Sequence, residues 1–323
     1  MIQSFKKIFF IFTFIVSLSV LIPACKVQQS KVNYAAGRKL LLRDEGLSQL
    51  CYINLAKPDE NWYMPVPAGR DIQLVGAGRV LIGTATGYEE REIKNGKKVA
   101  ELTSFAGTQT ARRLRNGNTL LAGANWQDKT GIVLTEVKAT GKVVGLVAFP
   151  GFSYVRCIRQ TVSGNYLVTA DDIVFEGDAS GKIVWQAKAT GLAKPHIWQS
   201  LRLANGQTVV SGGYAKNLQI FDADGKQVKV ITGPADVNPN FFAGFQILKN
   251  GNYVVGNWQG HGPKFGASGT QILEYDVNGK LVWSWKQDPT KFSSLQGVIV
   301  LDGLDTDMLH VEDKRGVLMP VIK

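Results

Sequence analysis

The chain has 323 residues, of which 45% are hydrophobic, and it carries a formal net charge of +11. This length allows one large all-β domain or two ordinary domains, and the apolar content excludes a disordered chain. The 35 glycines against 11 prolines suit many short strands joined by tight turns. The positive charge is dispersed along the chain, so we expect no nucleic-acid partner and a mild attraction to anionic surfaces or ligands.

The first 24 residues predict an export signal peptide. Lys6 and Lys7 precede the apolar run IFFIFTFIVSLSVLI of 15 residues, which is shorter than the roughly 20 residues that a membrane-spanning helix needs. The segment LIPAC that follows resembles a bacterial lipobox, in which Cys25 becomes a lipidated first residue; simple cleavage near Ala24 is the alternative. We therefore expect a signal peptide (1–24), a lipidated N-terminal linker (25–30) and an exported lipoprotein on the periplasmic side of the envelope, with the outer membrane favoured.

The two remaining cysteines, Cys51 and Cys157, both lie in apolar stretches. The chain has no CxxC pair, so the sequence excludes a disulfide-built fold and a CxxC zinc site. A single Cys51–Cys157 bridge is one alternative in an oxidising compartment. Two separate buried thiols fit the apolar surroundings better.

From residue 31 onward the chain repeats itself. A small polar turn and a short apolar burst recur at steps of 41, 40, 47, 42 and 45 residues, marked by Gly37, Gly78, Asn118, Asn165, Gln207 and Asn252. A second turn of Asp or Asn, Gly and Lys runs half a period out of phase, and the segments between turns alternate as strands do. Each period therefore holds four short strands, and this pattern predicts a single β-propeller domain over residues 31–323.

The number of blades depends on the two ends of the repeat. The segments SSLQGVIVLDG, DMLHVED and GVLMPVIK predict three strands after the sixth complete unit. We predict seven blades of four antiparallel strands, the seventh being completed by residues just after Cys25. Six blades are the alternative if the two terminal pieces merge, and a stacked sandwich or another β-solenoid is the competing architecture.

The repeated pattern D-x-x-G-K-x-V-W, as in DASGKIVWQ (178–186) and DVNGKLVWSW (276–285), resembles quinoprotein-like propellers. With the NGN turns, it also looks like bacterial arylsulfotransferases. The resemblance covers nearly all of the mature chain and implies a propeller whose tryptophans pack between blades. Quinone-binding members commonly have adjacent cysteines and about eight blades, which this chain lacks. The cofactor is therefore unknown, and neither pyrroloquinoline quinone (PQQ) nor calcium is favoured.

Strand polarity divides the loops between two faces. If strands a to d run from the axis outward, the b–c loops and the d–a connections open on one face, and the short a–b and c–d turns open on the other. Aromatic, amide, arginine and histidine residues concentrate on the first face, and we place Glu312 and Asp313 there too. This face is the predicted ligand-binding face. Its candidate residues are Trp258, Gln259, His261, His196, Trp198, Asn125, Trp126, Tyr154, Arg156, Asp171 and Tyr214.

His196 and His261 fall in neighbouring units of this face and are the candidate catalytic residues. Two histidines do not make a metal site without a third ligand, and the adjacent Asp171 and Asp172 would point to opposite sides of a strand, so we predict no metal. The sequence contains no GxxxxGK[ST], HExxH or GxSxG motif.

The leading hypothesis is a monomeric binding module for a small molecule, a glycan or an envelope protein, attached to the membrane by its N-terminal lipid. We lean against an enzyme. The alternative is a propeller enzyme acting on a small molecule as a lyase, a hydrolase, a quinoprotein-like oxidoreductase or a sulfotransferase. In the sulfotransferase version His261 is the nucleophile, and Arg112, Arg156 or His196 stabilises the anion.

Overall fold

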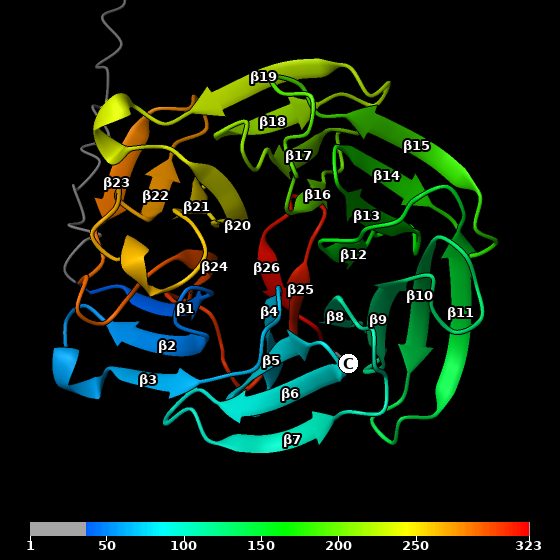
Figure 1. Cartoon of the computed structure of the whole chain (residues 1–323), viewed down its shortest axis with the longest axis horizontal. Coiled ribbons are helices and arrows are strands. Elements are labelled where there is room, and N and C mark those ends of the chain that lie inside the picture. Colours follow the sequence, from blue (N-terminus) through cyan, green and yellow to red (C-terminus); the bar gives the residue numbers. More distant parts are fainter. Residues whose placement is uncertain (1–36, 323) are drawn as a thin grey trace, which may run out of the picture. The chain divides into compact units, whose positions relative to one another are not determined.

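Six four-stranded antiparallel sheets surround a central axis in the computed structural model, which describes residues 37–322 (Figure 1). Each sheet is one blade, with its first strand nearest the axis. The predicted signal peptide and Cys25 lie outside the described residues. Within them, no helix is long and apolar enough to cross a membrane. The predicted all-β propeller with four-stranded antiparallel blades is confirmed.

The four strands of each blade follow one another from the axis outward. Blade 1 holds β24 (Leu295–Val300), β1 (Lys39–Asp44), β2 (Gln49–Asn54) and β3 (Trp62–Pro65); blade 2 holds β4 (Ile72–Gly76), β5 (Arg79–Thr84), β6 (Gly87–Glu92) and β7 (Lys98–Leu102); blade 3 holds β8 (Thr110–Arg113), β9 (Thr119–Ala124), β10 (Ile132–Val137) and β11 (Val143–Phe149). Blade 4 holds β12 (Ile158–Gln160), β13 (Tyr166–Ala170), β14 (Ile173–Gly177) and β15 (Ile183–Lys188); blade 5 holds β16 (Ser200–Arg202), β17 (Thr208–Ser211), β18 (Asn217–Phe221) and β19 (Gln227–Thr232); blade 6 holds β20 (Phe241–Ile247), β21 (Tyr253–Trp258), β22 (Ile272–Tyr275) and β23 (Leu281–Trp285). Three short 3₁₀ helices interrupt the connections: η1 (Pro58–Glu60), η2 (Ala235–Val237) and η3 (Pro263–Phe265).

The prediction of seven blades is wrong, and the alternative of six is correct. The C-terminal strand β24 pairs with β1, with Leu40 opposite Val300, and becomes the inner strand of blade 1. The two terminal pieces of the repeat therefore merge into one blade. β24 thus supplies the inner strand of blade 1, and its pairing with β1 closes the ring.

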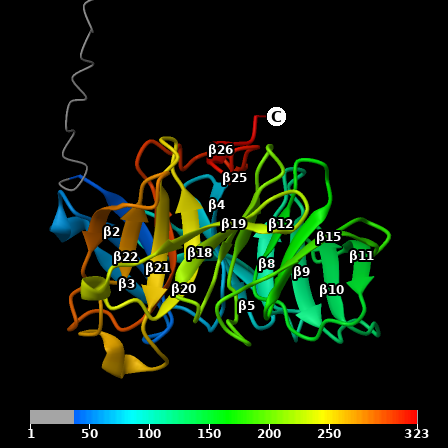
Figure 2. The same ribbon diagram turned by 90° about the horizontal axis from the view of Figure 1, so that it is seen from above.

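The other two C-terminal strands do not begin a further blade. β25 (His310–Glu312) and β26 (Leu318–Pro320) pair only with each other as a hairpin. The hairpin lies over the axis in Figure 1 and on one face of the ring in Figure 2. It touches the ends of inner strands, where Val75 bridges Leu309 and Ile247 bridges Val317. These are the ends that carry the a–b turns, so the hairpin covers the face opposite the b–c loops.

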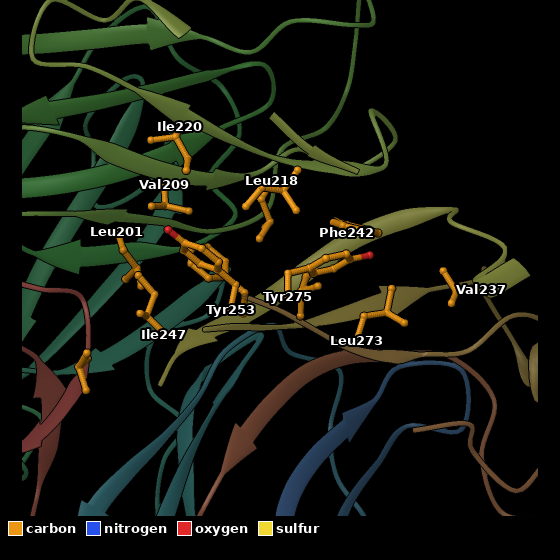
Figure 3. Packing of buried hydrophobic residues seen from close by; sticks show 14 residues of the cluster. Leu201, Val209, Leu218, Ile220, Val237, Phe242, Ile247, Tyr253, Leu273 and Tyr275 are labelled. Atoms are coloured by element: carbon orange, nitrogen blue, oxygen red, sulfur yellow. The ribbon is translucent and has the colours of Figure 1, made fainter. Parts of the chain in front are cut away.

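The burial pattern changes from the inner to the outer strands. Every residue of β20 and β21 is buried, whereas exposed and half-buried residues alternate along most of β15 and β19. Inner strands are covered by blades on both sides, and outer strands face solvent on one side. The core accordingly fills the spaces between blades; Figure 3 shows one such cluster, in which Leu201 and Val209 of blade 5 face Ile247 and Tyr253 of blade 6.

The c–d turns of blades 4 to 6 are regular because each is held by hydrogen bonds from the backbone to an aspartate side chain a few residues away. Asp178 accepts hydrogen bonds at Oδ1 from the backbone N–H groups of Ser180 and Lys182, and Gly181 takes φ = +86°. Glycine is favoured here because it adopts this left-handed backbone conformation without steric cost. Asp222 and Asp276 form the same turn in the next two blades. Cys51 and Cys157 are buried free thiols, as predicted.

Candidate functional site

All six blades contribute to one pocket of about 450 Å³ on the face of the b–c loops and d–a connections. Most of the aromatic residues lie on one side of the pocket, and the rest of the lining combines arginine and glutamine side chains with smaller residues. Beneath it, the axis narrows to a cavity of about 30 Å³ among charged residues. Arg70 and Trp198 line both spaces and so form the floor of the pocket.

Four aromatic side chains build one wall. Phe241 is at the centre, with its ring centroid 4.7 Å from that of Tyr214, 5.4 Å from Trp258 and 5.8 Å from Trp198. All three contacts are edge-to-face, with interplanar angles of 70 to 85°, a favourable arrangement for aromatic rings. Because each ring packs against another, the wall is preformed.

Both candidate histidines stand at the ends of this wall, each beside a carboxylate. His261 Nδ1 lies 2.8 Å from Glu45, and its ring is 4.7 Å from that of Trp258. His196 Nδ1 lies 3.2 Å from Asp171, and its ring is 6.0 Å from that of Tyr214. The structure therefore brings His196 and His261 to one pocket. A carboxylate on Nδ1 orients an imidazole.

The Glu45 carboxylate links the rim to the wall. One oxygen is beside His261, and the other accepts a hydrogen bond of 3.1 Å from the indole N–H of Trp258. At the other end, Asp171 and His196 both have positive φ, at 40° and 54°. Such backbone conformations cost free energy for residues with side chains and recur at binding sites. The turn also explains why Asp171 and Asp172 diverge, since Asp172 pairs with Lys188 on the outer strand.

Seven of the eleven candidate ligand-binding residues line the pocket. They are Trp258, His261, His196, Trp198, Tyr154, Arg156 and Tyr214. The other four, Asp171, Asn125, Trp126 and Gln259, support the structure around the pocket. Asp171 holds His196, and Asn125 accepts the Gly131 N–H in its own loop.

The remaining two candidates face inward. Trp126 lies in the hydrophobic cluster between blades 2 and 3. Its ring packs edge-to-face against that of Phe105, with the two ring centroids 6.0 Å apart. The amide of Gln259 is buried and donates to the carbonyls of Asn238 and Asn257.

Two expectations about charged residues are corrected. Arg112 lies in the axial cavity, 2.6 Å from Glu312 and 3.7 Å from Asp71, so it cannot stabilise an anion beside His261. Glu312 and Asp313 belong to the hairpin on the opposite face, not to the b–c loops. Glu312 and Asp313 were misplaced because the C-terminal strands were assigned to a seventh blade, and Arg112 was misplaced because it lies within the inner strand β8 and not in the connection before it.

The sequence reasoning missed several residues of the pocket, above all Arg70, Glu45 and Phe241. Arg70 stands in PVPAGRD, the d–a connection between β3 and β4. The rule that found Tyr154 and His196 in the other d–a connections would have found Arg70 in this one. Glu45 carried no such signal, because its partner His261 is 216 residues away.

No metal cluster accompanies these residues. Between residues 37 and 322, no three or more His, Cys, Asp or Glu side chains come close enough to hold an ion. The site therefore consists of an aromatic wall, two imidazole–carboxylate pairs and a set of arginines. Together with the ring of six closed blades, it defines the chain as a six-bladed β-propeller with a pocket on one face.

Comparison with known proteins supports this class. The fold is similar to a protein of unknown function from Bacteroides caccae, with a TM-score of 0.66 and 26% identity over 82% of this chain and 98% of that one. It is also similar to a streptogramin B lyase, with a TM-score of 0.56 and 12% identity over 83% and 89% of the two chains. Regucalcin from Agrobacterium tumefaciens, described as a calcium-binding protein, has a TM-score of 0.52 and 17% identity over 81% and 97%.

These similarities extend to the propeller fold alone for the lyase and for regucalcin. No family model and no curated protein matches this chain. The similarity to quinoprotein-like propellers and arylsulfotransferases that the repeats suggested is not confirmed.

Proposed function

We propose that this protein is a binding module of the cell envelope that takes a small organic molecule into the pocket between its loops. The preformed wall of Trp198, Tyr214, Phe241 and Trp258 supports this proposal. The pocket volume of about 450 Å³ lies within the range of roughly 300–1,000 Å³ that small-molecule sites occupy. Edge-to-face aromatic rings leave flat apolar surface for a planar ligand, and the rim supplies polar groups that orient it.

The neutral fluorophore N-phenylnaphthylamine tests the pocket, because its emission rises when it leaves water. We expect saturable binding by the wild-type protein and roughly tenfold weaker binding by Tyr214→Ala, the loss typical of an aromatic side chain at the centre of a contact. Tyr214 is 38% exposed, so its removal should change ligand contacts more than the fold.

Val184→Ser is the matched control. Val184 lies in a shallow apolar groove around Trp185 and Leu203, away from the pocket. Equal weakening by Tyr214→Ala and Val184→Ser would show that the fluorophore adheres to apolar surface in general, and the proposal of a binding pocket would fail.

A second candidate is an enzyme that acts on the bound molecule, because His261 and Glu45 form a carboxylate-oriented imidazole beside the aromatic wall. An imidazole placed in this way serves as a general base in lyases and hydrolases. Turnover of a bound compound that His261→Ala abolishes without loss of binding would establish the enzyme and replace the binding module.

We also propose that the protein is exported and held at the periplasmic side of the outer membrane by a lipid on Cys25. The basic start, the apolar run and LIPAC support this location. We expect Cys25→Ser to move the protein from the membrane fraction to the soluble fraction and to end incorporation of labelled palmitate. Cys51→Ser is the control, and palmitate incorporation that survives Cys25→Ser would contradict the lipid anchor.

A further inference from the structure

Two arginines of the pocket have no acidic partner. Among residues 37–322, neither Arg70 nor Arg156 forms an ion pair. Arg70 instead donates to the Tyr154 hydroxyl and the Val155 carbonyl. Both guanidinium groups lie over the ring of Tyr154, at 4.6 and 4.5 Å from its centroid.

Buried and half-buried arginines outside the pocket are neutralised. Arg38, Arg159 and Arg202 each pair with a carboxylate, at 2.5, 2.6 and 3.0 Å respectively. The pocket therefore departs from the rule that the rest of the chain follows. Burial lowers the pKa of Arg156 below its ordinary value, and the nearby charge of Arg70 lowers it further, whereas Tyr154 and Asp171 act in the opposite direction.

A third arginine among the residues that line the pocket adds to this charge. Arg43 is buried and donates only to the backbone carbonyls of Asp44, Gln49 and Pro67. Burial lowers its pKa to about 10, although Asp44 and Glu45 raise it. The two carboxylates of the rim form no ion pair with these arginines in the described part of the chain; Glu45 contacts His261 and Trp258, and Asp171 contacts His196.

The floor also presents donors that find no acceptor. In the described part of the chain, the indole N–H of Trp198 and the Nε–H of Arg156 are both buried without a hydrogen-bond partner. Trp198 is only 6% exposed, and the Arg156 guanidinium lies 5.1 Å from the centroid of its ring. An unpaired buried donor is unfavourable, so a ligand that brought acceptor oxygens here would supply the missing hydrogen-bond partners.

We propose that the floor of the pocket is an anion subsite, in which Arg70, Arg156 and Trp198 hold a carboxylate, sulfate or phosphate group of the ligand. The apolar body of the ligand then lies against Tyr214, Phe241 and Trp258. The inference rests on the proposed binding function and specifies its ligand class as a small aromatic or apolar anion. Charge-assisted hydrogen bonds from guanidinium groups are the strongest that a protein offers to such oxygens.

Anilinonaphthalene sulfonate tests this inference, because it adds one sulfonate to the ring system of N-phenylnaphthylamine. We expect the wild-type protein to bind the sulfonate more tightly than the neutral compound. The double variant Arg70→Gln/Arg156→Gln should bind the sulfonate roughly 100-fold more weakly, since each charge-assisted hydrogen bond contributes about tenfold or more. Binding of the neutral compound should change by less than about threefold.

The control variant Lys182→Gln/Lys226→Gln also removes two positive charges, but from c–d turns on the opposite face. It should bind the sulfonate nearly as the wild type does. Competition by benzoate, phenyl sulfate and phenyl phosphate then ranks the three anionic groups.

Two results would overturn the anion subsite while leaving the pocket intact. One is unchanged sulfonate binding by the Arg70→Gln/Arg156→Gln variant, and the other is equal weakening by the lysine control. Loss of both fluorophores in the arginine variant would also count against the subsite, since it would show a collapsed wall. If the wild type binds neither compound, the subsite and the proposed binding function both fail.

Discussion

Three arginines between blades share one construction. Arg38, Arg113 and Arg202 each pair with a glutamate on the third strand of a neighbouring blade, at 2.5, 2.6 and 3.0 Å. Each guanidinium also lies over an aromatic ring of that blade, at 4.2 Å for Trp283, 5.3 Å for Tyr88 and 3.9 Å for Trp185. Trp185 and Trp283 are the tryptophans of the repeated motif, so their predicted position between blades is confirmed, and the structure adds the arginine that covers them.

We expect Arg202→Ala to lower the free energy of unfolding by about 2 kcal/mol, as is typical when one partner of a largely buried ion pair is removed. Glu176 would keep only its hydrogen bond from Asn165, and Trp185 would lose its stacked cation. Urea unfolding followed by tryptophan fluorescence measures the change.

Gln160→Ala is the control for that variant. Gln160 ends β12 as Arg202 ends β16, and it bonds the turn glycine Gly164 as Arg202 bonds Gly206. It is exposed and reaches no glutamate, so we expect a change below about 0.5 kcal/mol. Equal losses in the two variants would show that the ion pair and the stacking contribute nothing.

At the scale of elements, the hairpin β25–β26 is joined to the ring by charge. Glu312 lies 2.6 Å from Arg112 and 2.9 Å from Arg159, and Asp71 lies 2.6 Å from Arg159. Two acids and two arginines therefore neutralise each other inside the axis. This quartet separates the pocket from the face that the hairpin covers.

The quartet should make stability depend on pH. Burial alone would raise the pKa of Glu312, but Arg112 and Arg159 outweigh it and lower the pKa from 4.5 to about 2. A carboxyl whose pKa is depressed in the folded state stabilises that state above its ordinary pKa, and this contribution is lost as the pH falls toward 2. We expect Glu312→Gln to cost about 3 kcal/mol at pH 7 and progressively less below pH 4.5.

Denaturant unfolding of the wild type and of Glu312→Gln at pH 7, 4 and 2.5 measures this difference. Glu101→Gln is the control, because Glu101 pairs with Lys98 on the exposed surface of β7 and should matter little at any pH. A difference between wild type and Glu312→Gln that stays constant from pH 7 to pH 2.5 would contradict the role of the Glu312 charge.

At the scale of the whole molecule, closure of the ring decides what each end of the chain does. β24 completes a blade whose other strands lie more than 200 residues earlier. With the ring closed at six, the residues after β24 have no blade to join and cover the axis instead. The hairpin thus covers one face, and the pocket opens on the other.

Part of the site could be predicted because it follows from local rules. Strand polarity placed Tyr154, His196, Tyr214 and Trp258 on one face, and all four line the pocket. Asn125, Trp126 and Gln259 lie in b–c loops on the same face, but their side chains point into turns and core. The packing of neighbouring residues decides whether a loop side chain faces the pocket or the core. Glu45 could not have been paired with His261 from the sequence, since nothing local relates them.

The sequence by itself determined the period of the repeat, the four strands of each blade, the Asp–Gly turns and the face on which each loop opens. These features arise from hydrogen bonds and side-chain alternation within a few residues. Only the tertiary structure decided the number of blades, the place of Glu312 in the axis and the gathering of unpaired arginines under an aromatic wall. Those features join residues far apart in the chain, and they exist only once the ring has closed.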